Sequence, residues 1–171
     1  GTSCVEALAC GRRFLGVDIN PLSHFVARVK TTPLTESDFS LIKLWVENIP
    51  TILNLHKRSC VRKEWEHYAE NLPWRVRKII SIMIDETSTL ELERQQEFVK
   101  CAILAAGQWA LNYKDHIPSK STFISFFNKK IYKMIQDLRG YQDDLRTVID
   151  VPLSQISRRR KLLCCNITDI D

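Results

Sequence analysis

The first twenty residues gather polar side chains whose types and spacing could bind a nucleotide-like ligand. Gly1, Thr2 and Ser3 provide a glycine and two hydroxyls, and Asp18 follows the short apolar run Phe14–Val17. That run shows no polar alternation, so it predicts a strand covered on both faces in a parallel sheet. Ligands of open α/β sheets bind beyond the carboxyl ends of the strands, where an acidic residue often accepts hydrogen bonds from ribose hydroxyls. The pattern therefore predicts a ribose contact at Asp18, although an ordinary strand-end turn has the same appearance.

Helices are predicted on both sides of this strand. Ser3 and Glu6 have the spacing of a capping box that starts the first helix, and Gly11 suits the left-handed position that ends it. Asn20 and Pro21 begin the second helix as N-cap and first-turn residue. Its apolar stripe consists of Leu22, Phe25, Val26 and Val29.

Several short motifs in residues 1–34 combine into one recognisable pattern. They are Gly1-Thr-Ser, Glu6-Ala7, Gly11-Arg12, Gly16-x-Asp18-x-Asn20-Pro21 and Ala27. Together they resemble the segment after the Gly-rich loop of S-adenosylmethionine-dependent DNA methyltransferases that modify amino groups, adenine N6 or cytosine N4. The resemblance implies S-adenosylmethionine as the cofactor. Its binding residues would be Gly1, Thr2 and Ser3 at the end of the loop, and Asp18 with its neighbour Ile19 at the ribose.

Two parts that the resemblance implies are missing from the sequence. In the family a first strand and an Asp-Pro-Phe-x-Gly segment precede the Gly-rich loop, and an Asp/Asn/Ser-Pro-Pro-Tyr tetrapeptide holds the target amine. All six prolines of this chain are isolated in the sequence. We therefore assign no catalytic residue, and we expect the chain to be a fragment that is inactive by itself.

Residues 35–155 are predicted to form a large α-helical insertion. Apolar residues at helical spacing predict helices that start near Thr35, Trp74 and Ser121, and another over residues 90–113. Gly140 is expected to end the last of these helices. Trp74 is expected in the core rather than as a platform for stacking bases.

Short basic clusters lie within this helical segment. They are His56-Lys57-Arg58, Arg75-Val-Arg77-Lys78, and Lys129-Lys130 with Lys133. Lysine and arginine supply most of the sequence-independent affinity for DNA, so the clusters could bind phosphates. A solvated helix face has the same composition, and both interpretations stay open.

Residues 156–171 are predicted to return to the α/β core. Residues 162–165 form a short buried-strand candidate, and Asn166 follows it. In the methyltransferase family the third strand often ends in Gly-Asp-Ala, whose Asp contacts the adenine of the cofactor. Asn166 stands in that place, and its amide can still hydrogen-bond an adenine. The predicted fold is therefore α/β, a partial Rossmann-like methyltransferase core (1–34 and 156–171) with a large α-helical insertion.

Composition limits the other classes of protein. The 171 residues carry a net charge of +5, with 44% apolar and 26% charged residues, which is typical of a globular domain. The charge suits DNA as a partner, but many proteins that never bind DNA share it. No apolar run reaches the roughly 20 residues that span a bilayer. The six cysteines form no Cys-x-x-Cys pair, so the sequence predicts neither a metal site nor a disulfide framework. Reduced cysteines are typical of the cytoplasm, which is the predicted location.

The predicted function is that of part of a site-specific DNA methyltransferase, of the restriction-modification type. Such an enzyme transfers a methyl group from S-adenosylmethionine to an exocyclic amino group of adenine or cytosine, after flipping the base out of the duplex. Two other functions stay open. One is a fragment of a nicotinamide-dependent Rossmann enzyme, and the other is a non-enzymatic helical module that binds DNA or a protein.

Overall fold

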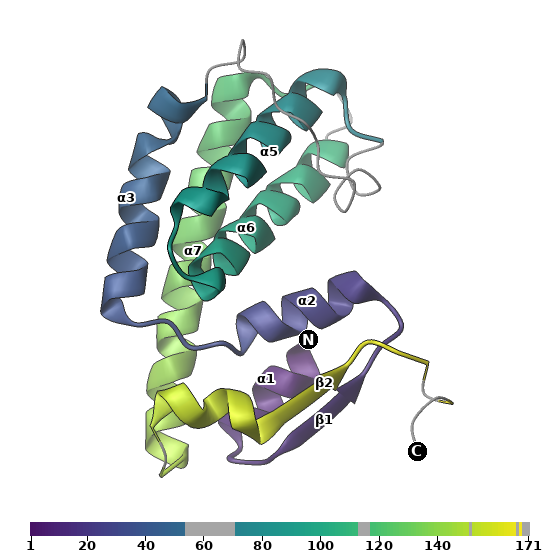
Figure 1. Cartoon of the computed structure of the whole chain (residues 1–171), viewed down its shortest axis with the longest axis vertical. Coiled ribbons are helices and arrows are strands. Elements are labelled where there is room, and N and C mark those ends of the chain that lie inside the picture. Colours follow the sequence, from purple (N-terminus) through teal and green to yellow (C-terminus); the bar gives the residue numbers. More distant parts are fainter. Residues whose placement is uncertain (54–70, 113–116, 151, 167, 169–171) are drawn as a thin grey trace. The chain divides into compact units, whose positions relative to one another are not determined.

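The computed structural model describes residues 1–53, 71–112, 117–150, 152–166 and 168. The chain divides into two compact units. The colours of Figure 1 follow the residue numbers and show which elements belong to each unit. The first unit combines Gly1–Thr35 with Ile135–Asp171, and the second is Glu36–Met134. The long helix α7 (Lys120–Val148) supplies residues to both. The predicted insertion, 35–155, therefore differs from the second unit at its far boundary, because α7 crosses that boundary without a break.

A two-stranded parallel sheet lies in the first unit. β1 (Phe14–Val17) pairs with β2 (Arg160–Leu163), so that Phe14 lies opposite Arg160 and Val17 opposite Leu163. The predicted strand over residues 14–17 is confirmed, but its predicted coverage on both faces is wrong, because Leu15 is 59% exposed. The second strand lies two residues earlier than expected. Parallel pairing requires a long crossover, because the two strands run in the same direction. Two strands do not distinguish a Rossmann-like sheet from other α/β arrangements, so this fold class stays a prediction.

The first helix, α1 (Thr2–Ala9), begins without the predicted capping box. Gly1 is its N-cap, and no side chain caps the helix. The prediction was wrong because Ser3 already lies inside the first turn, where it cannot act as the N-cap. The predicted end is confirmed: Gly11 has a φ of 70°, and its amide donates to the Leu8 carbonyl at 2.9 Å.

The second helix, α2 (Pro21–Lys30), begins as predicted. The Asn20 side chain accepts a hydrogen bond from the Leu22 amide at 2.9 Å, and Pro21 occupies the first turn.

The core of the first unit is built from both ends of the chain. Its buried residues are Cys4, Leu8, Leu145, Ile149 and Ile156. The last of these comes from the 3₁₀ helix η2 (Leu153–Arg159), which leads directly into β2.

A buried amide also connects the two halves of this unit. The Leu34 amide donates to Gln142 Oε1 at 2.8 Å, and Gln142 Nε2 donates back to the Leu34 carbonyl at 3.1 Å. Because Gln142 is 3% exposed, this pair satisfies backbone groups that water does not reach.

The second unit is helical in its described residues. It contains α3 (Glu36–Ile52), α5 (Trp74–Glu86), η1 (Thr87–Thr89), α6 (Glu93–Leu111) and the first half of α7. Its largest fully buried side chains come from all four helices: Phe39, Ile42, Ile49, Ile79, Ile82, Met83, Ile103, Phe123, Phe127 and Ile131. The predicted helices therefore exist, and they share an apolar core.

Polar contacts fix one end of the second unit, where α3 and α6 begin. The carboxylate of Asp38, 1% exposed, accepts hydrogen bonds from Arg94 Nε at 2.8 Å and Gln95 Nε2 at 2.6 Å. Trp45 Nε1 donates to the Glu86 carbonyl at 3.2 Å, which joins α3 to the end of α5.

Besides the capping box, two expectations about the helices were wrong. Gly140 does not end α7, which continues to Val148, because core residues on either side of the glycine hold the helix. Trp74 is 68% exposed instead of buried. Val76 defines the buried face of α5, and a residue two positions earlier lies about 200° away around the helix.

None of the helices in the described part of the chain combines the length and apolar character of a bilayer-spanning segment.

Candidate functional site

A cavity of about 110 Å³ lies at the carboxyl end of β1 in the first unit. Four chain segments form its walls. Gly1, Ser3 and Cys4 come from the start of α1, and Asp18 follows β1. The remaining lining residues are Phe14, Gly16 and Val17 of β1, Ser23, His24 and Ala27 of α2, and Leu162 and Leu163 of β2. Polar groups from the first turn of α1 and from the strand end therefore face one space.

Asp18 is held in place from two sides. Its backbone amide donates to the Leu163 carbonyl at 3.1 Å, which extends the strand pairing by one residue. Its carboxylate oxygen Oδ1 accepts the Asn20 amide at 2.8 Å. Among the described residues nothing donates to the second oxygen, Oδ2, and Asp18 is exposed. The carboxylate thus has a fixed orientation and one acceptor oxygen available to a ligand.

The start of α1 supplies the opposite side of the cavity. Gly1 and Ser3 line it, whereas Thr2 lies on the exposed first turn outside the lining. A Cβ on Gly1 would lie 3.6 Å from Ala27 Cα, so α1 begins in close contact with α2. The first amides of a helix have no partners within the helix and carry its positive partial charge. This side therefore suits a hydrogen-bond acceptor or an anion.

Gly16 allows the side chains of Phe14 and Leu162 to pack closely over the strand at the cavity wall. A Cβ at this position would lie 2.6 Å from Phe14 Cε1 and 3.1 Å from Leu162 Cδ2, so a side chain would not fit without movement. A glycine inside an apolar strand is a signal of such close approach, and sequence reasoning could have used it to assign Gly16 to the site.

His24 is a site residue for which the sequence carried no signal. Its Nε2 lies 3.3 Å from the Leu162 carbonyl oxygen, which connects α2 to β2 beside the cavity. The two residues are 138 positions apart in the chain, so no local pattern could have paired them.

Cys4, which lines the cavity, is a neutral thiol at neutral pH. Burial raises the pKa of the Cys4 thiol, although a hydrogen bond with Thr31 and the charge of Arg160 partly lower it. Burial also raises the pKa of Tyr141, which packs against the same core, to about 12.

Arg160 at the start of β2 connects the sheet to the end of α2. Its guanidinium donates to the Arg28 carbonyl at 2.8 Å, to Thr32 Oγ1 at 2.8 Å and to Thr31 Oγ1. These bonds fix the position of the strand that carries Leu162 and Leu163 to the cavity.

Besides Thr2, two more residues predicted for the site lie outside the cavity lining. Ile19 is 72% exposed, and its carbonyl lies 4.0 Å from Cys164 Sγ. Asn166 is exposed, and its side-chain oxygen accepts the Thr168 amide at 3.3 Å, which closes a turn after β2. The structure therefore brings together Gly1, Ser3 and Asp18, but not Thr2, Ile19 or Asn166.

No group of three or more histidine, cysteine, aspartate or glutamate side chains within the described ranges could hold a metal ion. The cysteines of those ranges are free thiols: Cys4, Cys10, Cys101, Cys164 and Cys165.

Comparison with known proteins finds one informative likeness. A 40-residue segment is 52% identical to the type II methyltransferase M.MvaI of Kocuria varians. The match covers 23% of this chain and 9% of that protein, so the likeness is confined to a small part of the relative. No family model and no solved structure matches the chain. The chain thus contains a methyltransferase-related segment.

Proposed function

We propose that this chain provides the ribose-binding side of an S-adenosylmethionine site in a DNA methyltransferase. The target would be an exocyclic amino group of adenine or cytosine. The observation that carries the proposal is the meeting of Gly1, Ser3 and Asp18 around one cavity at a strand end. The 40-residue likeness to a type II methyltransferase supports the choice of this class of enzyme.

The donors and acceptors around the cavity match the groups of this cofactor. Asp18 Oδ2 would accept hydrogen bonds from the ribose hydroxyls, since Oδ1 is already bound by the Asn20 amide. The first turn of α1 would bind the carboxylate of the methionine part through helix amides and the Ser3 hydroxyl. A cavity of about 110 Å³ is smaller than the roughly 300–1,000 Å³ of ligand pockets, so it would enclose only part of the cofactor.

The contribution of this chain would be binding and orientation, not catalysis. When bound, S-adenosylmethionine supplies an electrophilic methyl group. The Pro-Pro-Tyr element that the resembled family uses to hold the target amine is not in the 171 residues. Asp18 and the first turn of α1 would fix the ribose and the carboxylate, and thereby set the position of the cofactor's sulfonium centre.

Calorimetric titration with S-adenosylmethionine tests the proposal. The protein should include any residues that flank this sequence in its reading frame. Asp18→Asn keeps an acceptor for the Asn20 amide but removes the charge, so folding is preserved while the ribose contact weakens. We expect a loss of at least tenfold in affinity, about 1.4 kcal/mol.

The matched control is Asp144→Asn, which removes an exposed carboxylate of α7 outside the cavity lining. This variant should bind S-adenosylmethionine like the unchanged protein. Tighter binding of NADH than of S-adenosylmethionine would instead favour a nicotinamide-dependent enzyme. A folded protein that binds neither compound would refute the cofactor site and favour the non-enzymatic helical module.

A further inference from the structure

The two ends of the helical unit differ in charge. At the end where α3 and α6 begin and α5 finishes, carboxylates are frequent: Glu36, Asp38, Asp85, Glu86, Glu91 and Glu93. The other end is formed by residues 48–53, 71–78, 107–112 and 117–126. These described ranges contain no carboxylate, and their cations are Arg75, Arg77, Lys78 and Lys120. We call these four ranges the basic end.

Contacts within the unit bring the segments of the basic end together. Lys120 Nζ, at the start of α7, donates to the Leu53 carbonyl after α3 at 2.7 Å. Trp109 of α6 stacks on Phe126 of α7, with ring centroids 4.2 Å apart. A Cβ on Gly107 would lie 3.1 Å from Ile80 of α5, so α6 and α5 approach closely here.

The start of α5 places positive charge where its own helix disfavours it. Arg75, Arg77 and Lys78 fall within the first five residues, and the first turn contains no acid. The positive end of the helix dipole repels cations, by about 0.3–1 kcal/mol each at an exposed site. By contrast, α3 begins with Glu36 and Asp38, as the dipole prefers. The fold thus retains an arrangement at α5 that reduces its stability.

Nothing within the described residues neutralises these three cations. Arg75, Arg77 and Lys78 form no ion pair there, and Arg77 Nε is buried without a hydrogen-bond partner. Among the residues that the structure describes, the repulsion is therefore unrelieved, and an external anion would relieve it.

An exposed tryptophan adjoins the cations. Trp74 is 68% exposed, and the Arg75 guanidinium lies 5.5 Å from the centre of its ring, in the range of a cation–π contact. Tryptophan and arginine are enriched in binding interfaces, and the indole N–H can donate to a phosphate oxygen.

We propose that Trp74, Arg75, Arg77 and Lys78 form a contact surface for the phosphate backbone of duplex DNA. The inference rests on the proposed function for the choice of DNA, and it adds the surface that binds this substrate. Residues 75–78 span only about 5 Å along the helix. Three long cationic side chains that start within this length can reach neighbouring phosphates of a duplex, which carries about one negative charge per 1.7 Å of its axis.

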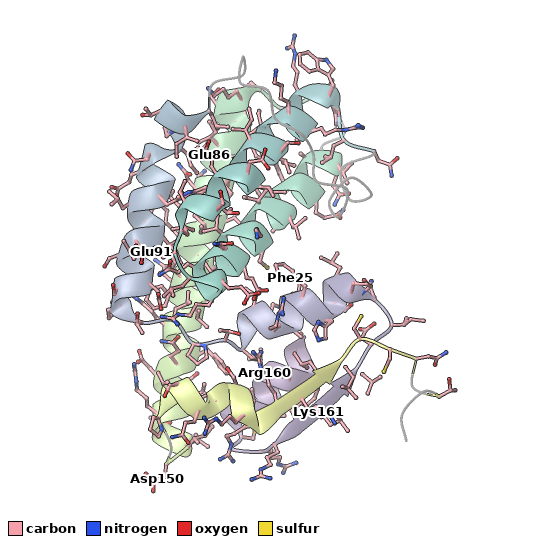
Figure 2. The ribbon with its side chains drawn as sticks, in the orientation of Figure 1. Phe25, Glu86, Glu91, Asp150, Arg160 and Lys161 are labelled. Carbon is pink, nitrogen blue, oxygen red and sulfur yellow. The ribbon has the colours of Figure 1, made fainter. Side chains whose placement is uncertain are left out.

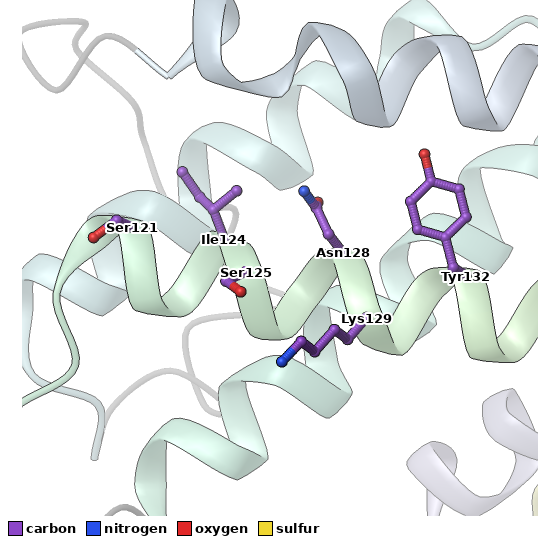
Figure 3. A pocket seen from close by; sticks show the side chains of 6 residues that line it. All are labelled: Ser121, Ile124, Ser125, Asn128, Lys129 and Tyr132. Atoms are coloured by element: carbon purple, nitrogen blue, oxygen red, sulfur yellow. The ribbon is translucent and has the colours of Figure 1, made fainter.

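A groove along α7 is a weaker candidate for the same role. Figure 3 shows its lining, in which hydroxyl groups accompany a single cation, Lys129. Its volume is about 610 Å³, and it is lined by Ser121, Ile124, Ser125, Asn128, Lys129 and Tyr132. One lysine supplies only one phosphate contact, so the start of α5 should contribute more of the electrostatic affinity.

The salt dependence of DNA binding tests the surface. Anisotropy of a fluorescein-labelled duplex is measured between about 50 and 200 mM salt for the triple variant Arg75→Gln, Arg77→Gln, Lys78→Gln. Each phosphate contact contributes about 0.9 to the slope of log K against log salt, so the slope should fall by roughly 2 to 3. The matched control is Lys43→Gln, Lys100→Gln, Lys130→Gln, which removes the same charge outside the basic end. Its slope should fall by less than about 1.

A second readout uses the exposed tryptophan. Addition of DNA should change the tryptophan emission, and Trp74→Phe should remove most of that change while circular dichroism confirms an unaltered helix content. An unchanged salt slope in the α5 triple, or an equal decrease in the control triple, would overturn the proposal. Binding to phosphatidylserine vesicles but not to DNA would also overturn it, in favour of a membrane surface.

The two sites can fail separately. Asp18→Asn should leave DNA affinity unchanged, and the α5 triple should leave S-adenosylmethionine affinity unchanged. Loss of the salt-slope difference with intact cofactor binding would therefore refute the DNA surface alone. The reverse result would refute the cofactor site alone.

Discussion

Replacement of Arg160 by methionine should destabilise the first unit by about 3 kcal/mol. The guanidinium donates to three acceptors at the end of α2: the Arg28 carbonyl and the hydroxyls of Thr31 and Thr32. A buried hydrogen bond from a charged group contributes about 1.5–3 kcal/mol. Arg160 is only half-buried, and water can reach acceptors that it releases, so we reduce each contribution to about 1 kcal/mol. Methionine keeps most of the packing of the side-chain stem.

The next residue of the same strand provides the control. Lys161 is exposed, and successive strand residues point to opposite faces of the sheet. Figure 2 labels both Arg160 and Lys161. Lys161→Met removes the same charge without breaking these hydrogen bonds, and should change stability by less than about 0.5 kcal/mol. Arg160→Lys keeps the charge, but an ammonium group cannot reproduce the planar fork, so it should recover only about 1 kcal/mol.

Urea unfolding followed by far-ultraviolet circular dichroism measures these differences. With a slope of about 1–3 kcal/mol per molar urea, a loss of about 3 kcal/mol lowers the midpoint by at least about 1 M. Tryptophan emission reports separately on the second unit, because all four tryptophans fall within Glu36–Met134. Equal midpoints for Arg160→Met and Lys161→Met would refute the reasoning, since they would show that the bonds to α2 add nothing to stability.

Two further predictions concern other buried polar groups. Burial raises the pKa of Tyr141 to about 12 from its ordinary value of 10.0, so its contribution to stability is complete below pH 10 and declines as the pH rises toward 12. The difference in tyrosinate absorbance between the unchanged protein and Tyr141→Phe should show this late titration, and a midpoint near pH 10 would contradict it. Asp38→Ala should destabilise the second unit by about 1–3 kcal/mol, because it leaves the buried Gln95 amide without its acceptor, whereas water can reach the partly exposed Arg94. Urea unfolding followed by tryptophan emission would measure this loss, and a value below about 1 kcal/mol would argue against a structural role for the carboxylate.

The features that sequence predicted well depend on residues within one turn of each other. Gly11 ends α1 because its own φ is positive, and Asn20 caps α2 through an amide two residues away. The strand over residues 14–17 and the place of Asp18 at its end follow from the same short-range logic. The predicted capping box at Ser3 was wrong for a related reason. The N-cap is Gly1, and a shift of two residues in the start of a helix changes which side chain can cap it.

The features that sequence missed depend on partners far along the chain. Arg160 binds Thr32 across 128 positions, and Gln142 binds Leu34 across 108. No periodicity encodes such pairs, so an arginine at a strand entry looks like any other solvated cation. Gly140 shows the complementary error: no atom lies within 4 Å of the place its Cβ would occupy, so the glycine reflects neither a helix end nor a close contact. Gly140 therefore gave a wrong prediction of the helix end, because the core residues on either side of it keep α7 helical as far as Val148.

The candidate cofactor site therefore has two kinds of determinant. The orientation of Asp18 comes partly from its neighbour Asn20, which the motif specifies, and partly from Leu163, whose carbonyl accepts the Asp18 amide. The position of Leu163 depends in turn on Arg160, three residues earlier on the same strand. A chain that carried only residues 1–34 would keep the recognisable motif but lose one wall of the cavity and one of the two restraints on the carboxylate. The motif thus specifies Asp18 and the Asn20 amide that orients its carboxylate, whereas the return strand adds the bond that holds the Asp18 backbone.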